Sequence, residues 1–422
     1  MIALSAPPHI LRTSLRLSGS KSISNRLLML KEILQVDSDL VNLSDSEDTN
    51  LLKKALEQVR YKNKESVDIH HAGTDMRFLT AFLATREGEW TLTGSGRMKE
   101  RPIGELVNAL TMLGAEIRYL EKSGFPPLLI HGKKLSGGRI EMDSSLSSQF
   151  VSALLLIAPK FEKSLDLHLK GKTVSRPYIE MTISLLKSVG VNVEQKENQV
   201  VIQPSVSPFP FSLFPFPSSI YIESDWSSAS YWYNICALAG NAEIELIGLS
   251  QNSLQADSVL PGIYRNLGVE TIVTDNSLLL RSCKPGLKEF SYDFTDCPDI
   301  AQTLAVTCFG LGIEASLTGL STLKVKETDR ILALKNELEK CGARIEAGAD
   351  HIDIFPNPEP GTRNSKSILI KTYSDHRMAM SFAPLAFLYK ELRIEDPDVV
   401  VKSYPRFWED LISVGFNVNL QP

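Results

Sequence analysis

The sequence repeats one pattern along almost its whole length. An amphipathic helical segment ends at a glycine, and an alternating segment typical of a strand follows. A shorter first copy, residues 46–59, lacks the glycine. The glycines recur at intervals of 73–78 residues and are Gly114, Gly190, Gly268, Gly342 and Gly415. Repetition at a nearly fixed interval predicts six related units, each mixing helices with strands.

A second kind of helical segment alternates with the first. Each copy opens with a Ser, Thr or Asp cap and then becomes almost wholly apolar, so it must be buried. These segments span residues 20–30, 73–84, 144–158, 224–239, 295–308 and 374–388. The amphipathic helices are expected to lie outside them and to begin near Arg101, Ser175, Asn252, Val325 and Tyr404. We therefore predict a mixed α/β fold with three units in each of two domains.

Length supports two domains, because 422 residues exceed one ordinary hydrophobic core. The run "PSVSPFPFSLFPFPSS", residues 204–219, contains too many prolines for a central strand. We interpret it as a connecting loop at the boundary between the halves. The alternative is a docking motif for a proline-binding partner.

Composition excludes several classes of protein. The formal net charge of −5 argues against a general nucleic-acid binder. No apolar run approaches the roughly 20 residues that span a bilayer, and the N-terminus lacks the pattern of an export signal. Five cysteines, odd in number and without CxxC spacing, indicate reduced thiols rather than disulfides or a zinc site. We expect a cytoplasmic protein without nucleic-acid or membrane partners.

Polar and charged residues gather where the buried helical segments begin. The free N–H groups of a helix start, together with hydroxyls and cations, can bind an anion. Capping alone explains the serines and aspartates, so a single cluster is weak evidence. The clusters contain Lys21, Ser22, Arg26, Thr74, Arg77, Ser147, Ser148, Gln149, Asp299, Asp375, His376 and Arg377.

More cations precede the outer helices, and the stretch "LKVKETDRI" is the most informative case. We expect Lys326 and Arg330 in the first turn of one helix, on one face, although a helix start already carries partial positive charge. Either they pair on a solvated surface, or they bind an external anion. Asp299 and Glu327 among these cations are candidate base and acid; the alternatives are a helix cap and a pair with Arg330. The other cations of this set are Arg97, Lys99, Arg101, Arg176, Lys402 and Arg406.

The motifs "GSKSISNR", "AGTDMR", "GSGRMKERPIG", "SSQF", "SRPY", "SDWSSASY", "KVKETDR" and "SDHRMAM" resemble the 5-enolpyruvylshikimate-3-phosphate synthase family. They run in order from Gly19 to about Arg406. The resemblance implies two similar domains, each of three βαβαββ repeats around buried parallel helices, an inside-out α/β barrel. The first domain would comprise residues 20–222, mainly on the shikimate-phosphate side. Residues 1–19 and 223–422 would form the second domain, which would carry the acid, the base and the phosphoenolpyruvate side of the site. The buried helices would point at the cleft between the domains.

The resemblance also implies the chemistry. The enolpyruvyl group of phosphoenolpyruvate would move to the 5-hydroxyl of shikimate 3-phosphate, with release of phosphate and without a metal or organic cofactor. Asp299 would take the hydroxyl proton, Glu327 would protonate the methylene carbon, and Lys21 and Lys326 would assist. Shikimate 3-phosphate would contact Lys21, Ser22, Arg26, Ser147, Ser148, Gln149, Ser175, Tyr178, Asp299, Thr322 and Lys326. Phosphoenolpyruvate would contact Lys21, Gly73, Arg101, Gln149, Arg330, Arg377 and Lys402.

Three residues depart from the family pattern: His71 and Thr322 stand where many members have asparagine, and Phe78 stands where many have proline. Because Gly73 leaves room beside phosphoenolpyruvate, we expect glyphosate to compete. The chain is expected to be a monomer. Two rival interpretations are the sister enzyme acting on UDP-N-acetylglucosamine, which typically carries a reactive cysteine in its first domain, and a non-catalytic anion-binding scaffold. All five cysteines here follow residue 235.

Overall fold

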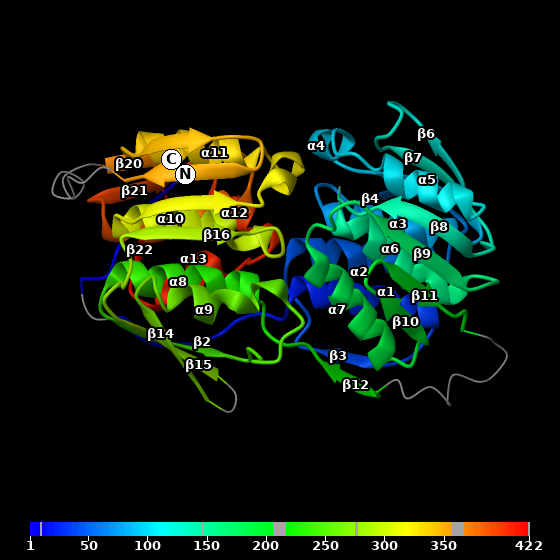
Figure 1. The fold of residues 1–422 in the computed structure, drawn as a ribbon, viewed down its shortest axis with the longest axis horizontal. Coiled ribbons are helices and arrows are strands. Elements are labelled where there is room, and N and C mark those ends of the chain that lie inside the picture. The colour runs from blue at the N-terminus through cyan, green and yellow to red at the C-terminus, as the bar shows by residue number, and fades with distance from the viewer. Residues whose placement is uncertain (9–10, 146, 206–216, 275–276, 357–366, 421–422) are drawn as a thin grey trace. The chain divides into compact units, whose positions relative to one another are not determined.

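The computed structural model describes residues 1–8, 11–145, 147–205, 217–274, 277–356 and 367–420. The chain forms two compact units (Figure 1). The N-terminal unit is Lys21–Ile222, and the C-terminal unit combines Met1–Ser20 with Glu223–Pro422. Most of the proline-rich run that we interpret as a connecting loop, residues 206–216, lies outside the described residues.

The N-terminal unit alternates helices and strands as the repeat predicts. Its helices are α1 (Lys21–Leu34), α2 (Glu47–Arg60), α3 (Gly73–Ala84), α4 (Gly96–Lys99), α5 (Gly104–Met112), α6 (Ser148–Ile157) and α7 (Arg176–Ser188). Its strands are β3 (Asp39–Val41), β4 (Lys64–Asp68), β5 (Gly88–Thr93), β6 (Glu116–Tyr119), β7 (Leu128–Gly132), β8 (Gly138–Asp143), β9 (Leu165–Lys170), β10 (Val193–Lys196), β11 (Gln199–Ile202) and β12 (Ser219–Tyr221).

The C-terminal unit has the same alternation. Its helices are α8 (Trp226–Ala239), α9 (Leu260–Tyr264), α10 (Ala301–Leu311), α11 (Arg330–Lys340), α12 (His376–Phe382) and α13 (Phe407–Ser413), with short 3₁₀ turns η3 (Ala256–Val259), η4 (Pro298–Ile300), η5 (Ser321–Val325) and η8 (Pro397–Lys402). Its strands are β1 (Ile2–Ser5), β2 (Leu11–Arg16), β13 (Ala242–Ile247), β14 (Val269–Val273), β15 (Ser277–Ser282), β16 (Glu289–Asp293), β17 (Glu314–Thr318), β18 (Arg344–Ala347), β19 (His351–Phe355), β20 (Ser367–Ile370), β21 (Glu391–Ile394) and β22 (Asn417–Leu420).

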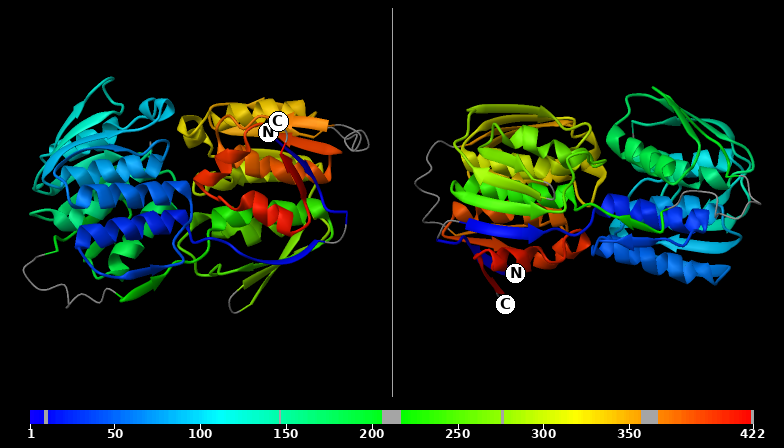
Figure 2. Two further views of the ribbon diagram at one scale, coloured as in Figure 1. Left: turned by 180° about the vertical axis from the view of Figure 1, so that it is seen from behind. Right: turned by 90° about the horizontal axis from the view of Figure 1, so that it is seen from below.

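The four-stranded sheets share one pairing scheme. In β16-β17-β19-β18, the strands on either side of α10 pair in parallel, and the hairpin that follows α11 adds the antiparallel strands. The orders β4-β5-β7-β6, β10-β11-β9-β8, β14-β15-β13-β2 and β20-β21-β1-β22 follow the same scheme. In the last of these, N-terminal β1 lies between β21 and β22 (Figure 2). Within the described residues the first copy keeps only the parallel pair β12-β3, in line with its shortened sequence.

Buried helices fill the middle of each unit, as predicted. In the C-terminal unit α10 packs against α8 and α12, and in the N-terminal unit α3 packs against α6, with α1 touching both. Side chains such as Leu30, Phe82 and Leu154 are fully buried on these helices. The prediction of a mixed α/β fold with apolar helices inside is therefore confirmed.

The five repeated glycines end their helices in the left-handed backbone region, with φ between 86° and 99°. This confirms their predicted role, because residues with a β-carbon rarely adopt that conformation.

Several outer helices start later than predicted. The expectation that Lys326 and Arg330 share one helical face is wrong, since α11 begins only at Arg330. Asp329 caps the helix by accepting a hydrogen bond from Leu332 N at 3.1 Å, and Lys326 lies in extended backbone before it. Similarly, α5 begins at Gly104 rather than near Arg101, and α9 at Leu260 rather than near Asn252.

Candidate active site

Arg330 lies at the centre of a charged cluster in the C-terminal unit. Its Nε donates to Asp375 Oδ2 at 2.6 Å, and its Nη2 donates to Glu327 Oε2 at 2.9 Å. Its Nη1 lies 3.5 Å from Asp299 Oδ1. The residue is only 1% exposed, so one buried guanidinium joins three carboxylates from three different segments.

Glu327 lies between two cations. Lys402 Nζ is 2.6 Å from Glu327 Oε1, while Arg330 binds the other oxygen. Lys402 ends η8 and is buried. The cations on both sides fix the carboxylate and support its charge. An anionic ligand could compete with Glu327 for these cations.

Asp299 is the most accessible of the three carboxylates. Its side chain is 21% exposed, and Arg377 Nη2 lies 3.1 Å from its Oδ2. Arg377 Nη1 also donates to the backbone oxygen of Asp299 at 2.6 Å, and Lys326 Nζ lies 3.7 Å from Oδ1. A carboxylate that is accessible and oriented by cations suits a general base.

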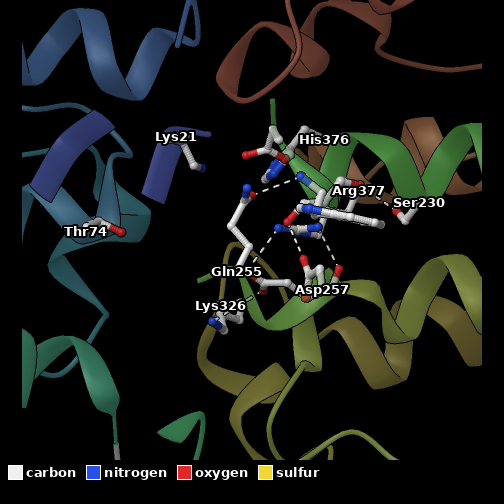
Figure 3. Close-up of polar contacts among 12 residues, drawn as sticks. Lys21, Thr74, Ser230, Gln255, Asp257, Lys326, His376 and Arg377 are labelled. Atoms are coloured by element: carbon white, nitrogen blue, oxygen red, sulfur yellow. Dashed lines mark hydrogen bonds and ion pairs between the residues drawn. The ribbon is translucent and has the colours of Figure 1, made fainter. Parts of the chain in front are cut away.

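Asp257 is a functional candidate that the sequence reasoning missed. It accepts a hydrogen bond from Ser227, and among the described residues its Oδ1 has no hydrogen-bond partner. In Figure 3 its side chain lies in the same region as those of Gln255, Lys326 and Arg377. Burial first, and the nearby charge of Asp299 second, raise the pKa of Asp257 from 3.8 to about 7. The polar stretch "QNSLQAD", residues 251–257, which runs into η3, was the available signal.

This raised pKa predicts how Asp257 affects stability. Because the folded pKa exceeds the unfolded value, Asp257 binds its proton more tightly in the folded state, and its contribution falls as pH rises toward 7. We expect Asp257→Asn to gain roughly 2 kcal/mol relative to the parent between pH 5 and pH 8. Urea denaturation of both proteins at the two pH values measures this gain. An equal change in the free energy of unfolding of both proteins between pH 5 and pH 8 would contradict this prediction.

In the N-terminal unit Lys21 begins α1 and pairs with Asp48. Lys21 Nζ lies 2.9 Å from Asp48 Oδ2, and that carboxylate is almost buried in the first turn of α2. Ser46 caps α2 by accepting a bond from Thr49 N. Sequence reasoning missed Asp48, because an acidic residue in a first helical turn is usually explained by the helix dipole alone.

Arg26 is buried within the same unit on neutral partners. Its Nε donates to Thr182 Oγ1 at 2.8 Å, and its Nη1 donates to Ser22 O at 2.9 Å. Its Nη2 donates to Tyr178 O at 3.2 Å. Burial lowers the pKa of Arg26 to about 10. A buried cation whose described hydrogen-bond partners are all neutral is suited to an anionic ligand.

Gly73 and Arg101 lie in direct contact. A β-carbon on Gly73 would come within 2.3 Å of Arg101 Nη1, so the guanidinium rests on the first residue of α3. Arg77 fixes the loop after Arg101 by donating to Pro102 O at 2.9 Å and to Gly73 O at 3.0 Å. The predicted phosphoenolpyruvate residues Gly73 and Arg101 are thus brought together.

The remaining predicted residues of this unit lie at the starts of α6 and α7. Ser147 caps α6 by accepting a bond from Gln149 N at 3.2 Å, and Gln149 Nε2 donates to Thr74 Oγ1 at 3.1 Å. Ser148 is the first residue of α6 and is buried. Ser175 precedes α7 in the left-handed region at φ 52°.

Some predicted cations lie apart from these clusters. Arg97 pairs with Glu100 at 3.0 Å, Lys99 with Glu121 at 2.6 Å, and Arg176 with Glu180 at 3.2 Å. Arg97 is exposed, and Lys99 and Arg176 are half-buried. For these residues the structure favours the surface-pair interpretation.

Comparison with known proteins gives the family. Residues 58–411 match the family described as EPSP synthase (3-phosphoshikimate 1-carboxyvinyltransferase). A Bacteroides fragilis protein named 3-phosphoshikimate 1-carboxyvinyltransferase is 44% identical over 417 residues, covering 99% of this chain and 98% of the relative. The chain belongs to the EPSP synthase family. A Shewanella baltica protein of the same name is 36% identical over 429 residues, covering 96% of this chain and 97% of the relative.

Solved structures agree on the fold of this family member. EPSP synthase from Acinetobacter baumannii aligns with a TM-score of 0.74 at 20% identity, covering 100% of both chains. The enolpyruvyl transferase NikO from Streptomyces tendae aligns with a TM-score of 0.77 at 14% identity, covering 99% of this chain and 98% of that one. These identities are low, so they support the two-domain inside-out α/β fold alone.

The three departures from the family pattern have distinct surroundings. His71 Nε2 lies 3.1 Å from Glu47 Oε2 at the start of α2. Phe78 is a buried residue of α3, and the Arg26 guanidinium lies 5.4 Å from the centre of its ring. Thr322 Oγ1 is buried and has no hydrogen-bond partner among the described residues. Buried hydroxyls in folded proteins usually have a hydrogen-bond partner.

Neither a metal-binding cluster nor a membrane-spanning helix is found in the described part of the chain. It contains no group of three or more His, Cys, Asp and Glu residues that could hold a metal ion. None of its helices is long and apolar enough to span a membrane.

Proposed function

We propose that the chain transfers the enolpyruvyl group of phosphoenolpyruvate to the 5-hydroxyl of shikimate 3-phosphate and releases phosphate. The relatives that match over nearly the whole chain are named for this activity. The observation that carries the proposal is the cluster in which Arg330, Arg377 and Lys402 surround Asp299 and Glu327. A catalyst of proton transfer on anionic substrates needs this combination of cations and carboxylates.

Asp299 and Glu327 divide the proton transfers in this proposal. Asp299 accepts the proton of the 5-hydroxyl as its oxygen attacks the central carbon of phosphoenolpyruvate. Glu327 donates a proton to the methylene carbon, which gives a tetrahedral adduct with a methyl group. In the second step the methyl group returns a proton to Glu327 and the phosphate leaves with a proton from Asp299.

Glu327 can act as an acid only when its pairing with the surrounding cations weakens. A proton donor must be neutral, whereas Lys402 and Arg330 support the charged carboxylate. We propose that the phosphate and carboxylate of phosphoenolpyruvate compete for these cations. The pairing of Lys402 and Arg330 with Glu327 then weakens, which favours the protonated form of the Glu327 carboxyl.

The N-terminal unit supplies most contacts to shikimate 3-phosphate in this proposal. Arg26 is a buried cation on neutral partners, and Ser147, Ser148 and Ser175 place hydroxyls at two helix starts. Lys21, Ser22, Gln149 and Tyr178 complete the set, with Asp299, Thr322 and Lys326 from the C-terminal unit. Phosphoenolpyruvate is assigned to Lys21, Gly73, Arg101, Gln149, Arg330, Arg377 and Lys402.

Phosphate release from phosphoenolpyruvate tests the function directly. We expect release in the presence of shikimate 3-phosphate and none with phosphoenolpyruvate alone or with UDP-N-acetylglucosamine as acceptor. Mass spectrometry of the product distinguishes enolpyruvyl transfer from hydrolysis. Release that depends on the nucleotide sugar would instead support the sister enzyme.

Gly73 predicts how the protein responds to glyphosate. We expect micromolar glyphosate to compete with phosphoenolpyruvate, as an order of magnitude. Gly73→Ala should displace Arg101, because the added carbon would lie 2.3 Å from its Nη1. The KM for phosphoenolpyruvate and the inhibition constant of glyphosate should each rise about tenfold or more.

Gly96→Ala is the matched control, because a β-carbon there meets no atom within 4 Å. Steady-state kinetics with both substrates and glyphosate compare the two variants with the parent. Full activity of the parent in millimolar glyphosate would contradict this prediction, as would equal behaviour of the two variants.

We further propose that the protein acts as a cytoplasmic monomer. All five cysteines are free thiols, in line with a reducing compartment. Sedimentation at assay concentration measures the oligomeric state.

A further inference from the structure

The turn between β20 and α12 carries an unusual backbone. Tyr373 and Ser374 are consecutive non-glycine residues in the left-handed region, with φ of 54° and 55°. Side chains with a β-carbon are strained there, so such a turn persists only where its surroundings hold it. Asp375 and Arg377 follow directly, so this turn sets the position of two charged residues of the candidate active site.

A buried carboxylate on α11 holds this turn. Tyr373 OH donates to Glu337 Oε1 at 2.7 Å, and Lys371 N donates to Glu337 Oε2 at 3.1 Å. The Glu337 side chain is fully buried, and Lys340 pairs with it and donates to Leu369 O at 2.9 Å. Burial raises the pKa of Tyr373 to about 12, with the bond to Glu337 contributing, so the phenol remains a donor at neutral pH.

The same helix holds the turn at a second point. Glu337 lies seven residues, or about two helical turns, after Arg330, and therefore on the same side of α11. Arg330 Nε binds Asp375 Oδ2 at 2.6 Å, two residues beyond Tyr373. Arg377 in turn binds both the backbone and the side chain of Asp299.

We propose that Glu337 and Tyr373 are positioning residues, which fix Arg377 and through it Asp299 by holding the strained turn. Their contacts with the turn, rather than with a reacting atom, carry this role. The inference rests on the proposed function, in which Arg377 contacts phosphoenolpyruvate.

Tyr373→Phe tests the proposal by removing only the hydroxyl. We expect the KM for phosphoenolpyruvate to rise about tenfold and kcat to fall, because Arg377 and Asp299 lose their fixed positions. The Kd for shikimate 3-phosphate, measured by fluorescence titration, should change less than twofold, because most of its proposed contacts lie in the N-terminal unit. Glu337→Gln keeps an acceptor oxygen for Tyr373 OH and should show a smaller rise. Tyr389→Phe is the matched control, because its hydroxyl donates to Cys341 O at 3.1 Å, at the far end of α11. Its kinetics should equal those of the parent.

Two results would overturn the positioning role. One is an unchanged KM for phosphoenolpyruvate in Tyr373→Phe. The other is a rise in both substrate constants by one common factor together with a lower Tm, which indicates a structural role only. Absence of phosphate release in the parent would overturn the proposed function instead, so the two failures are distinguishable.

Discussion

Glu327→Gln is expected to lower kcat by roughly 10²-fold or more, because the amide keeps the shape of the side chain but cannot donate a proton to carbon. Binding of both substrates should persist, since Arg330 and Lys402 remain in place. Rapid-quench measurement of phosphate release gives the turnover, and fluorescence titration with shikimate 3-phosphate gives the binding. Loss of both together would indicate a damaged fold rather than a missing acid.

Glu339→Gln is the matched control for this prediction. Glu339 lies near the end of α11, and its side chain is 42% exposed and pairs with Lys335 at 3.6 Å. Its variant should turn over like the parent. If Glu327→Gln also kept full turnover, the protein would be using its cations without this acid, as the anion-binding scaffold requires.

The fold was predictable because its signals are local. A glycine after an amphipathic segment favours a helix end in the left-handed region, and an apolar helix must be buried. Both signals are independent of distant parts of the chain. The positions of Gly114 and Gly342 and the depth of α3 and α10 therefore followed from the sequence. Helix starts were less predictable: the helix that was expected to begin near Val325 begins at Arg330, after the cap at Asp329.

The partners of the charged residues were not predictable. Arg330 binds Asp375, which is 45 residues away, and Lys21 binds Asp48, which is 27 residues away. Local spacing shows only the pair of Arg330 with Glu327, three residues before it. Which loops meet at a helix start depends on the packing of whole repeats, so Asp48 and Asp257 escaped the sequence reasoning.

Arg330→Met is expected to lower the free energy of unfolding by about 3–5 kcal/mol, which is the usual effect of removing one partner from a buried ion pair. The Asp375 side chain is fully buried and that of Glu327 is 13% exposed, so the variant leaves carboxylates without their shared cation. The kcat/KM for phosphoenolpyruvate should also fall at least 10²-fold in the proposed mechanism. Arg12→Met is the control, because that exposed pair with Glu243 should contribute about 1 kcal/mol or less.

A second substitution separates the two effects of Arg330. In Arg330→Met/Asp375→Asn the buried charge of Asp375 is removed, while asparagine can still cap α12 as Asp375 does with Arg377 N at 2.8 Å. We expect the double variant to unfold at higher urea than Arg330→Met, yet to bind phosphoenolpyruvate no better. Recovery of stability without recovery of affinity shows that Arg330 has two roles, charge balance within the fold and recognition of the substrate. If Arg330→Met were as stable as the parent, the carboxylates around it would not depend on its charge, and the central position assigned to Arg330 would be wrong.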